Sequence, residues 1–287
     1  MHIAVMGIGL LGRAVAERLK ATGHTVTVYN RTRAKTDPLG ALGIEVAASA
    51  AQAIRRADCT LLFLADAEAI HAVVLSADTR SALAGRTIIQ MGTISPQESR
   101  EFHHAISEAE GDYFEVPVLG SLAEATAGTL LLMVGGTQDQ LHRWGPVLQS
   151  LGQEPRLVGP VGQAAALKLA LNQLIAAEIA AFSLSLGLIQ RSGVSVDLFM
   201  SVLKESALFA PVFEKKLPRL QQRQYDHPNF STRHLLKDVN LFLGVAKGNG
   251  LVTSGLDGVC DILEATIARG FGAVDYSALC EEISPQR

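Results

Sequence analysis

The sequence predicts an α/β protein in which a doubly wound, mostly parallel sheet is followed by an all-helical domain, joined to it through a long helix. Two observations lead to this prediction. Short apolar runs alternate with stretches of helical spacing over residues 1–160, and nearly every later segment has a helical pattern. Alternating strands and helices are typical of βαβ units, which assemble into parallel sheets covered by helices.

The predicted strands are short apolar runs that are rich in β-branched residues and bounded by turn residues. They lie at residues 2–6, 25–29, 59–64, 86–91, 113–116, 129–134 and 155–158. Between most of them apolar residues recur at helical spacing, at residues 10–22, 49–57, 67–76, 95–109 and 137–150. We therefore expect an α/β domain over residues 1–160.

The pattern changes after Val158, where Gly159, Pro160 and Gly162 interrupt the chain. The elements predicted beyond this point are helices at residues 163–191, 195–204, 209–217, 232–248, 253–269 and 275–283. An all-helical domain is therefore expected over residues 161–287. Because it is so apolar, we expect it to bury surface against another subunit of a symmetric oligomer.

Composition excludes several classes of protein. The 287 residues are 48% hydrophobic and 18% charged, and their net charge of −3 gives no general attraction to nucleic acid or anionic lipid. Three widely spaced cysteines suit a reducing compartment and argue against disulfides or a cysteine zinc site. No secretory signal precedes the first strand, so we expect a cytoplasmic protein. His103 and His104 are adjacent and do not share a helix face, and no metal site is predicted.

A glycine-rich turn, "GIGLLG", follows the first predicted strand and opens the first predicted helix. Gly7 permits the tight turn, Gly9 lets a pyrophosphate approach the backbone, and Gly12 lets the helix pack closely on the strand. This context is the one that a Rossmann-type dinucleotide site requires, with the phosphates at the helix N-terminus. The residues expected to contact the cofactor here are Gly7, Ile8, Gly9, Leu10 and Leu11.

Cofactor choice should be set at the end of the second strand, about 20 residues beyond the glycines, where an acid would bind the ribose hydroxyls of NAD. The sequence there is "YNRTRAK", with Asn30 and no acid. Arg31 and Thr32 can bind a 2′-phosphate, and Lys35 lies one helical turn beyond Arg31. These four residues favour NADP, with a solvated basic helix start as the alternative.

The run 165–188 is apolar nearly throughout, yet it carries Lys168 and, one turn later, Asn172. Helical geometry places these two side chains about 40° apart on one face, which Ile175 and Ile179 continue into an interior or a cleft. A buried lysine tends to lose its proton near neutral pH, which suits a general acid. The alternative is a lysine at the start of the helix whose amine reaches water, and spacing alone favours this alternative.

The same run approaches membrane-spanning length. Lys168, Asn172 and Glu178 interrupt it, and ionised side chains are costly in lipid. We therefore expect a buried helix of a soluble protein and no membrane partner.

Five dispersed stretches have the order and spacing of one known family. "GPVGQAAALKLALN" (159–172) has the pattern of its catalytic-lysine signature, and "GIGLLG" with "NRT" that of its NADP-type cofactor site. "MGTISP" (91–96) is similar to a loop with a nicotinamide-proximal threonine, "FEVPVLGSLAEATAGTL" (114–130) to a substrate-recognition loop, and "LLKDVNL" (235–241) to a Lys-Asp motif. Together, from residue 2 to the end of the chain, they resemble the β-hydroxyacid dehydrogenase family.

The resemblance implies hydride transfer between a nicotinamide and a carbonyl carbon, in a cleft between two domains. It makes Lys168 the general acid and Asn172 the group that orients the carbonyl oxygen or the lysine. The other implied residues are Thr93, Gly120, Ser121 and Phe230 at the substrate, and Thr93 and Lys237 at the cofactor. The resemblance also implies a homodimer or a homotetramer, between which the sequence does not choose.

Within the family, "PVLGS" followed by "AEATAGTL" most resembles the glyoxylate/succinic semialdehyde reductases, which reduce small carboxylate-bearing aldehydes to hydroxyacids. Leu119 and Gly92 stand where the family commonly has serine, and this puts the substrate in doubt more than the chemistry. The alternatives are oxidation of a β-hydroxyacid, as in a 3-hydroxyisobutyrate dehydrogenase, and an imine reductase, which Lys168 disfavours. A non-catalytic NADPH-binding protein is the alternative from another class.

Overall fold

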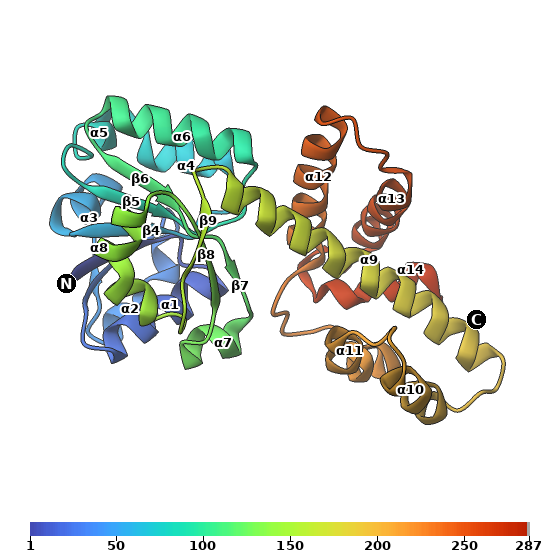
Figure 1. The fold of residues 1–287 in the computed structure, drawn as a ribbon. Coiled ribbons are helices and arrows are strands. Elements are labelled where there is room, and N and C mark those ends of the chain that lie inside the picture. The colour runs from blue at the N-terminus through green and yellow to red at the C-terminus, as the bar shows by residue number, and fades with distance from the viewer. Residues whose placement is uncertain (286–287) are drawn as a thin grey trace. The chain divides into compact units, whose positions relative to one another are not determined.

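The computed structural model describes residues 1–285 (Figure 1). The chain divides into two compact units, one from Met1 to Lys168 and one from Leu169 onward. The division lies inside a long helix, a few residues beyond the boundary expected at residue 160. The first unit is an α/β domain and the second is all-helical, which confirms the predicted fold class.

The first unit contains a nine-stranded sheet in the order β3-β2-β1-β4-β5-β6-β8-β7, with β9 paired to β8. Strands β1 to β6 pair in parallel, while β8 pairs antiparallel with β6 and β7. The strands are β1 (His2–Met6), β2 (Thr25–Tyr29), β3 (Glu45–Val46), β4 (Cys59–Leu62), β5 (Thr87–Gln90), β6 (Asp112–Glu115), β7 (Val118–Leu119), β8 (Leu131–Gly135) and β9 (Arg156–Gly159).

The helices of the first unit cover both faces of this sheet (Figure 1). They are α1 (Leu10–Ala21), α2 (Asp37–Ala41), α3 (Ala50–Arg56), α4 (Ala67–Val74), α5 (Ala77–Arg80), α6 (Pro96–Glu108), α7 (Leu122–Ala127) and α8 (Gln138–Gln149). In β1, Ile3 and Val5 pack with α1 and α8, whereas Ala4 and Met6 pack with α3, α4 and α6. Successive strand residues point to opposite faces, so one strand serves two cores.

Every strand and helix expected in the first unit is present within a few residues, and five short elements were not expected. Strands β3 and β7 have two residues each, too few to show an alternating pattern. Helices α2, α5 and α7 have between four and six residues, about one turn, so their apolar residues show no helical period. Packing against neighbouring elements, rather than a pattern in their own sequence, stabilises these short strands and helices.

The second unit consists of helices packed around apolar cores. Its elements are α9 (Gln163–Arg191, which begins in the first unit), α10 (Val196–Glu205), α11 (Pro211–Gln222), α12 (Thr232–Gly248), α13 (Ser254–Ala268) and α14 (Cys280–Ile283). Helix α11 continues through Pro218, beyond its expected end at residue 217. The helix expected at 275–283 is a 3₁₀ turn, Tyr276–Leu279, followed by the short α14.

Helix α9 is the one helix among the described residues that is long and apolar enough to cross a membrane. The core helix of a soluble protein meets the same criterion. Ala176, Ile179 and Phe182 are buried among the helices of the second unit, as a core helix requires.

A buried ion pair lies in the second unit. Both carboxylate oxygens of Asp275 accept hydrogen bonds from Lys216 Nζ at 2.7 Å. The lysine side chain is 6% exposed and the aspartate is fully buried. Burial lowers the pKa of the Lys216 amine, and the Asp275 carboxylate opposes this shift.

We predict that Lys216→Met lowers the free energy of unfolding by about 3–5 kcal/mol, because it leaves the Asp275 carboxylate buried without its cation. Lys204→Met is the matched control, since Lys204 pairs with Glu214 on the exposed surface and should cost less than about 1 kcal/mol. Urea titrations of both variants measure the difference. Equal losses in the two variants would contradict the prediction.

Candidate active site

Four of the motifs singled out in the sequence lie at one edge of the sheet. Gly7 follows β1, Asn30 follows β2, Thr93 follows β5 after two residues, and the 116–121 segment follows β6. Because these four strands run parallel, their carboxyl ends share an edge. Ligands of doubly wound sheets bind at this edge, at the point between β1 and β4 where the strand order reverses.

The three glycines of the turn differ in what they require. Gly7 has a φ of 92°, and a Cβ there would overlap the carbonyl oxygen of Phe63. A Cβ on Gly12 would overlap the carbonyl oxygen of Gly7. Gly9, by contrast, faces open space, so the protein's own packing does not demand a glycine. A side chain at Gly9 would fill the space in front of the first turn of α1, which is where a pyrophosphate would lie.

Asn30 connects this turn to the end of β2. Its Oδ1 accepts a hydrogen bond from the Ile8 amide at 3.0 Å, and its Nδ2 donates to the Thr32 carbonyl oxygen at 2.9 Å. Arg31, Thr32 and Lys35 are all exposed beside it. The helix N-terminus of α1 and the two cations therefore fit the phosphates of a dinucleotide.

The loop after β5 explains one departure from the family pattern. A Cβ on Gly92 would crowd the carbonyl oxygen of Leu64, so a serine there would need this backbone to shift. The Gln90 side chain, which is buried, donates from Nε2 to the Gly92 carbonyl oxygen at 3.1 Å. Thr93 is half-buried in the same loop. Gly92 thus allows the loops after β4 and β5 to approach closely.

The predicted substrate loop contains a carboxylate of its own. Gly120 has a φ of 142°, a conformation that side chains disfavour. Ser121 is the N-cap of α7, and both its backbone amide and its hydroxyl donate to Glu124 Oε2. Leu119 is half-buried next to this turn. The donors at Ser121 are therefore suited to a carboxylate, and Glu124 occupies them in this structure.

Lys168 lies near the start of α9 and is 8% exposed, so its side chain does not extend into bulk water. The first turn of this helix is held by Glu115, the last residue of β6. Glu115 Oε1 accepts hydrogen bonds from the backbone amides of Gly162 at 2.8 Å and Ala165 at 2.9 Å. This contact brings the turn before Lys168 to the carboxyl end of β6.

Asn172 belongs to a buried polar cluster in the second unit. Its Nδ2 donates to Asp238 Oδ2 at 2.6 Å, and Lys237 Nζ lies 2.9 Å from Asp238 Oδ1. Asn172 is 2% exposed and Asp238 is 3% exposed. One carboxylate therefore links the asparagine of α9 to the lysine of α12.

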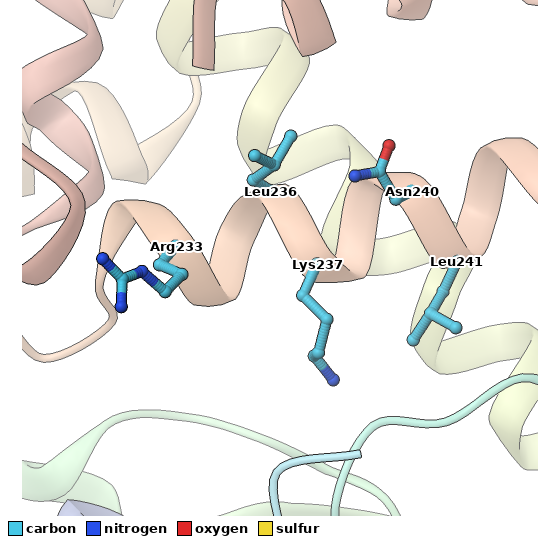
Figure 2. A pocket seen from close by; sticks show the side chains of 5 residues that line it. All are labelled: Arg233, Leu236, Lys237, Asn240 and Leu241. Carbon is cyan, nitrogen blue, oxygen red and sulfur yellow. The ribbon is translucent and has the colours of Figure 1, made fainter. Parts of the chain in front are cut away.

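One face of α12 lines a pocket with a volume of about 480 Å³. Figure 2 shows the side chains of Lys237 and Leu241 pointing to the same side of the helix, with Arg233 one turn before Lys237. The lining residues are Arg233, Leu236, Lys237, Asn240 and Leu241. Phe230 is partly buried and packs against the apolar core of the second unit, with its ring 6.0 Å from that of Tyr276.

Among residues 1–285, no three histidine, cysteine or acidic side chains gather as metal ligands would. The adjacent histidines diverge: His103 packs near the Tyr113 ring, while His104 lies 3.5 Å from Glu108.

No role was predicted for Glu115 or Asp238 from the sequence. The signal for Glu115 was present, because residues 159–163 ("GPVGQ") offer the helix no capping side chain and one must come from elsewhere. Asp238 was named only as part of the Lys-Asp motif, because its contact with Asn172 joins positions 66 residues apart.

Two family models cover nearly the whole chain. One, described as the NAD binding domain of 6-phosphogluconate dehydrogenase, matches residues 2–162. The other, described as the NAD-binding domain of NADP-dependent 3-hydroxyisobutyrate dehydrogenase, matches residues 162–283.

Relatives match over their full length. Glyoxylate/succinic semialdehyde reductase 1 of Arabidopsis thaliana is 29% identical over 289 residues, which span 100% of both chains. The 2-hydroxy-3-oxopropionate reductase of Escherichia coli (strain K12) is 28% identical over 99% of this chain and 97% of its own. The solved structure of Mycobacterium tuberculosis 3-hydroxyisobutyrate dehydrogenase with L-serine has a TM-score of 0.88 and 24% identity over 98% of each chain, which shows a shared fold.

The glycine turn, the lysine-bearing helix and both family models therefore agree along the chain. The chain belongs to the β-hydroxyacid dehydrogenase family of NAD(P)-dependent oxidoreductases.

Proposed function

We propose that the protein is an NADPH-dependent reductase of small aldehydes that bear a carboxylate, such as glyoxylate and succinic semialdehyde. The observation that carries the proposal is the buried Lys168, whose helix is held by Glu115 at the carboxyl end of β6, on the same edge of the sheet as the cofactor turn. The similarity to a glyoxylate/succinic semialdehyde reductase supports this substrate class. Leu119, where the family commonly has serine, would make the substrate pocket more apolar.

The cofactor would be held by the first turn of α1, whose leading amides have no partner inside the helix. Arg31, Thr32 and Lys35 would bind the 2′-phosphate of NADP, and Lys237 would contact the cofactor from α12. Bound NADPH supplies the hydride that reduces the carbonyl carbon.

Lys168 would donate a proton from Nζ to the carbonyl oxygen as negative charge develops there, and would regain one from solvent. Asn172, one turn further along α9, would orient this oxygen or the lysine. The Asp238 carboxylate fixes the Asn172 amide for this task.

Thr93, Gly120 and Ser121 would bind the substrate carboxylate. Since Glu124 accepts from both Ser121 donors in this structure, it must release at least one of them for the substrate to bind there. Phe230, which is partly buried against the core of the second unit, would form an apolar wall for the substrate.

The second candidate is the reverse reaction, oxidation of a β-hydroxyacid with Lys168 as the base. The match of residues 162–283 to the 3-hydroxyisobutyrate dehydrogenase model favours it. The same residues serve both directions, so the substrate distinguishes them.

We predict that purified protein oxidises NADPH fastest with glyoxylate or succinic semialdehyde. The fall in NADPH absorbance, from the same starting concentration, measures the rates with both aldehydes and with a cyclic imine. The rise in absorbance with 3-hydroxyisobutyrate and NADP measures the reverse reaction. Faster turnover of the imine or of the hydroxyacid would replace the proposed function, and NADPH binding without any turnover would indicate a binding protein.

The exposed cations beside β2 predict a kcat/KM for NADPH above that for NADH. Arg31→Ala should lower kcat/KM for NADPH about tenfold or more and leave that for NADH nearly unchanged, because only NADPH carries the 2′-phosphate. Arg55→Ala, which removes an exposed cation from α3, is the control. A wild-type ratio below one would contradict NADP preference.

Lys168→Ala should lower kcat by about 10²–10⁴-fold, the usual contribution of a general acid, with little change in the Kd for NADPH. Fluorescence of bound NADPH measures the Kd, and Lys168→Arg tests whether charge without a transferable proton restores the rate. Near-normal kcat in Lys168→Ala would remove the acid from the mechanism.

A further inference from the structure

We infer that Glu115 is a positioning residue for Lys168: its carboxylate caps the first turn of α9 and fixes where the next turn places the lysine. The inference rests on the proposed role of Lys168 as the proton donor. Every contact that carries it lies within the first unit.

The cap comes from far along the chain because none is available locally. Helices usually begin with a serine, threonine, aspartate or asparagine, whose side chain accepts from the first free amides. Before α9 the chain has Gly159, Pro160, Val161 and Gly162, none of which can do so. The amides of Gly162 and Ala165 donate instead to Glu115, which precedes them by 47 and 50 residues.

The carboxylate is itself fixed in orientation. While Oε1 accepts from the two amides, Oε2 accepts from Ser99 Oγ, which also lies 2.9 Å from Tyr113 Oη. A Cβ on Gly135 would overlap Oε1, so glycine at that position leaves room for the carboxylate. Both oxygens therefore have partners that determine the direction of the side chain.

Charge favours the same arrangement. A carboxylate at a helix N-terminus is stabilised by the helix dipole and by the amides that point at it. Burial raises the pKa of Glu115, and the hydrogen bonds from Ser99, Ala165 and Gly162 oppose that shift. Tyr113 is the titratable group beside it, and burial raises the pKa of that phenol as well, so the phenol stays neutral.

The distance to the lysine is short. Lys168 follows Ala165 by three residues, which is about 4.5 Å along the helix axis. A shift of the first turn therefore moves Lys168 by nearly the same distance. A misplacement of about 1 Å can lower the rate of a reaction about 100-fold. Glu115 acts on the proton donor without touching the substrate.

The test compares Glu115→Ala with Asp112→Asn. Asp112 lies on the same strand and its carboxylate accepts from Thr87 and Gln140, not from α9, so it controls for general destabilisation of β6. We expect Glu115→Ala to lower kcat about 10–100-fold at nearly unchanged Kd for NADPH, and Glu115→Gln, which keeps an acceptor for the amides, to restore most of the rate. Hydrogen exchange should accelerate at amides 162–166 in Glu115→Ala alone.

Unchanged kcat in Glu115→Ala, or an equal loss in Asp112→Asn, would overturn the inference. Thermal melting of both variants shows that the comparison is made on folded protein. Lys168→Ala, measured in parallel, separates the two proposals. If it loses kcat while Glu115→Ala does not, only the positioning role fails; if it keeps kcat, the proton-donor assignment fails.

Discussion

The buried carboxylate of Glu115 is the constraint on which the candidate site depends. It joins the end of the central strand β6 to the first turn of α9, the helix that carries Lys168 and Asn172. Without such a cap, a helix preceded by glycine and proline would begin with unpaired buried amides. The contact that completes the helix also brings the lysine-bearing turn to the edge of the sheet where the cofactor motifs gather.

Two carboxylates hold the polar face of α9. Glu115 accepts from its backbone at the first turn, and Asp238 accepts from the Asn172 side chain two turns later. Each belongs to a different unit, and each is buried. An apolar helix can therefore present an amine and an amide in a defined direction, which electrostatic stabilisation of a developing oxyanion requires. In the cofactor turn, Gly9 is explained by the space that a pyrophosphate would need, because the protein's own packing does not require a glycine there.

Periodicity and glycine spacing predicted the parallel sheet, the long helix α9 at 163–191 and the glycine turn, because each is a local pattern strong enough to specify its own structure. Short elements such as β7 and α7 could not be predicted, since two to six residues show no period. The hydrogen-bond partners of the site residues could not be predicted either. The bonds between Glu124 and Ser121, Asn30 and Ile8, and Asp238 and Asn172 depend on where the chain folds back or on which rotamer forms. Phe230 is partly buried against the core of the second unit, and its place at the substrate stays a prediction.

If the Lys168 amine delivers a proton to the substrate oxygen, the two atoms must lie within hydrogen-bond distance. A crystal structure of the protein with NADP and an unreactive carboxylate-bearing substrate analogue would show this distance. We expect Lys168 Nζ within about 3 Å of the oxygen on the reacting carbon. An amine that points into bulk solvent, or that is separated from this oxygen by more than one water molecule, would contradict it.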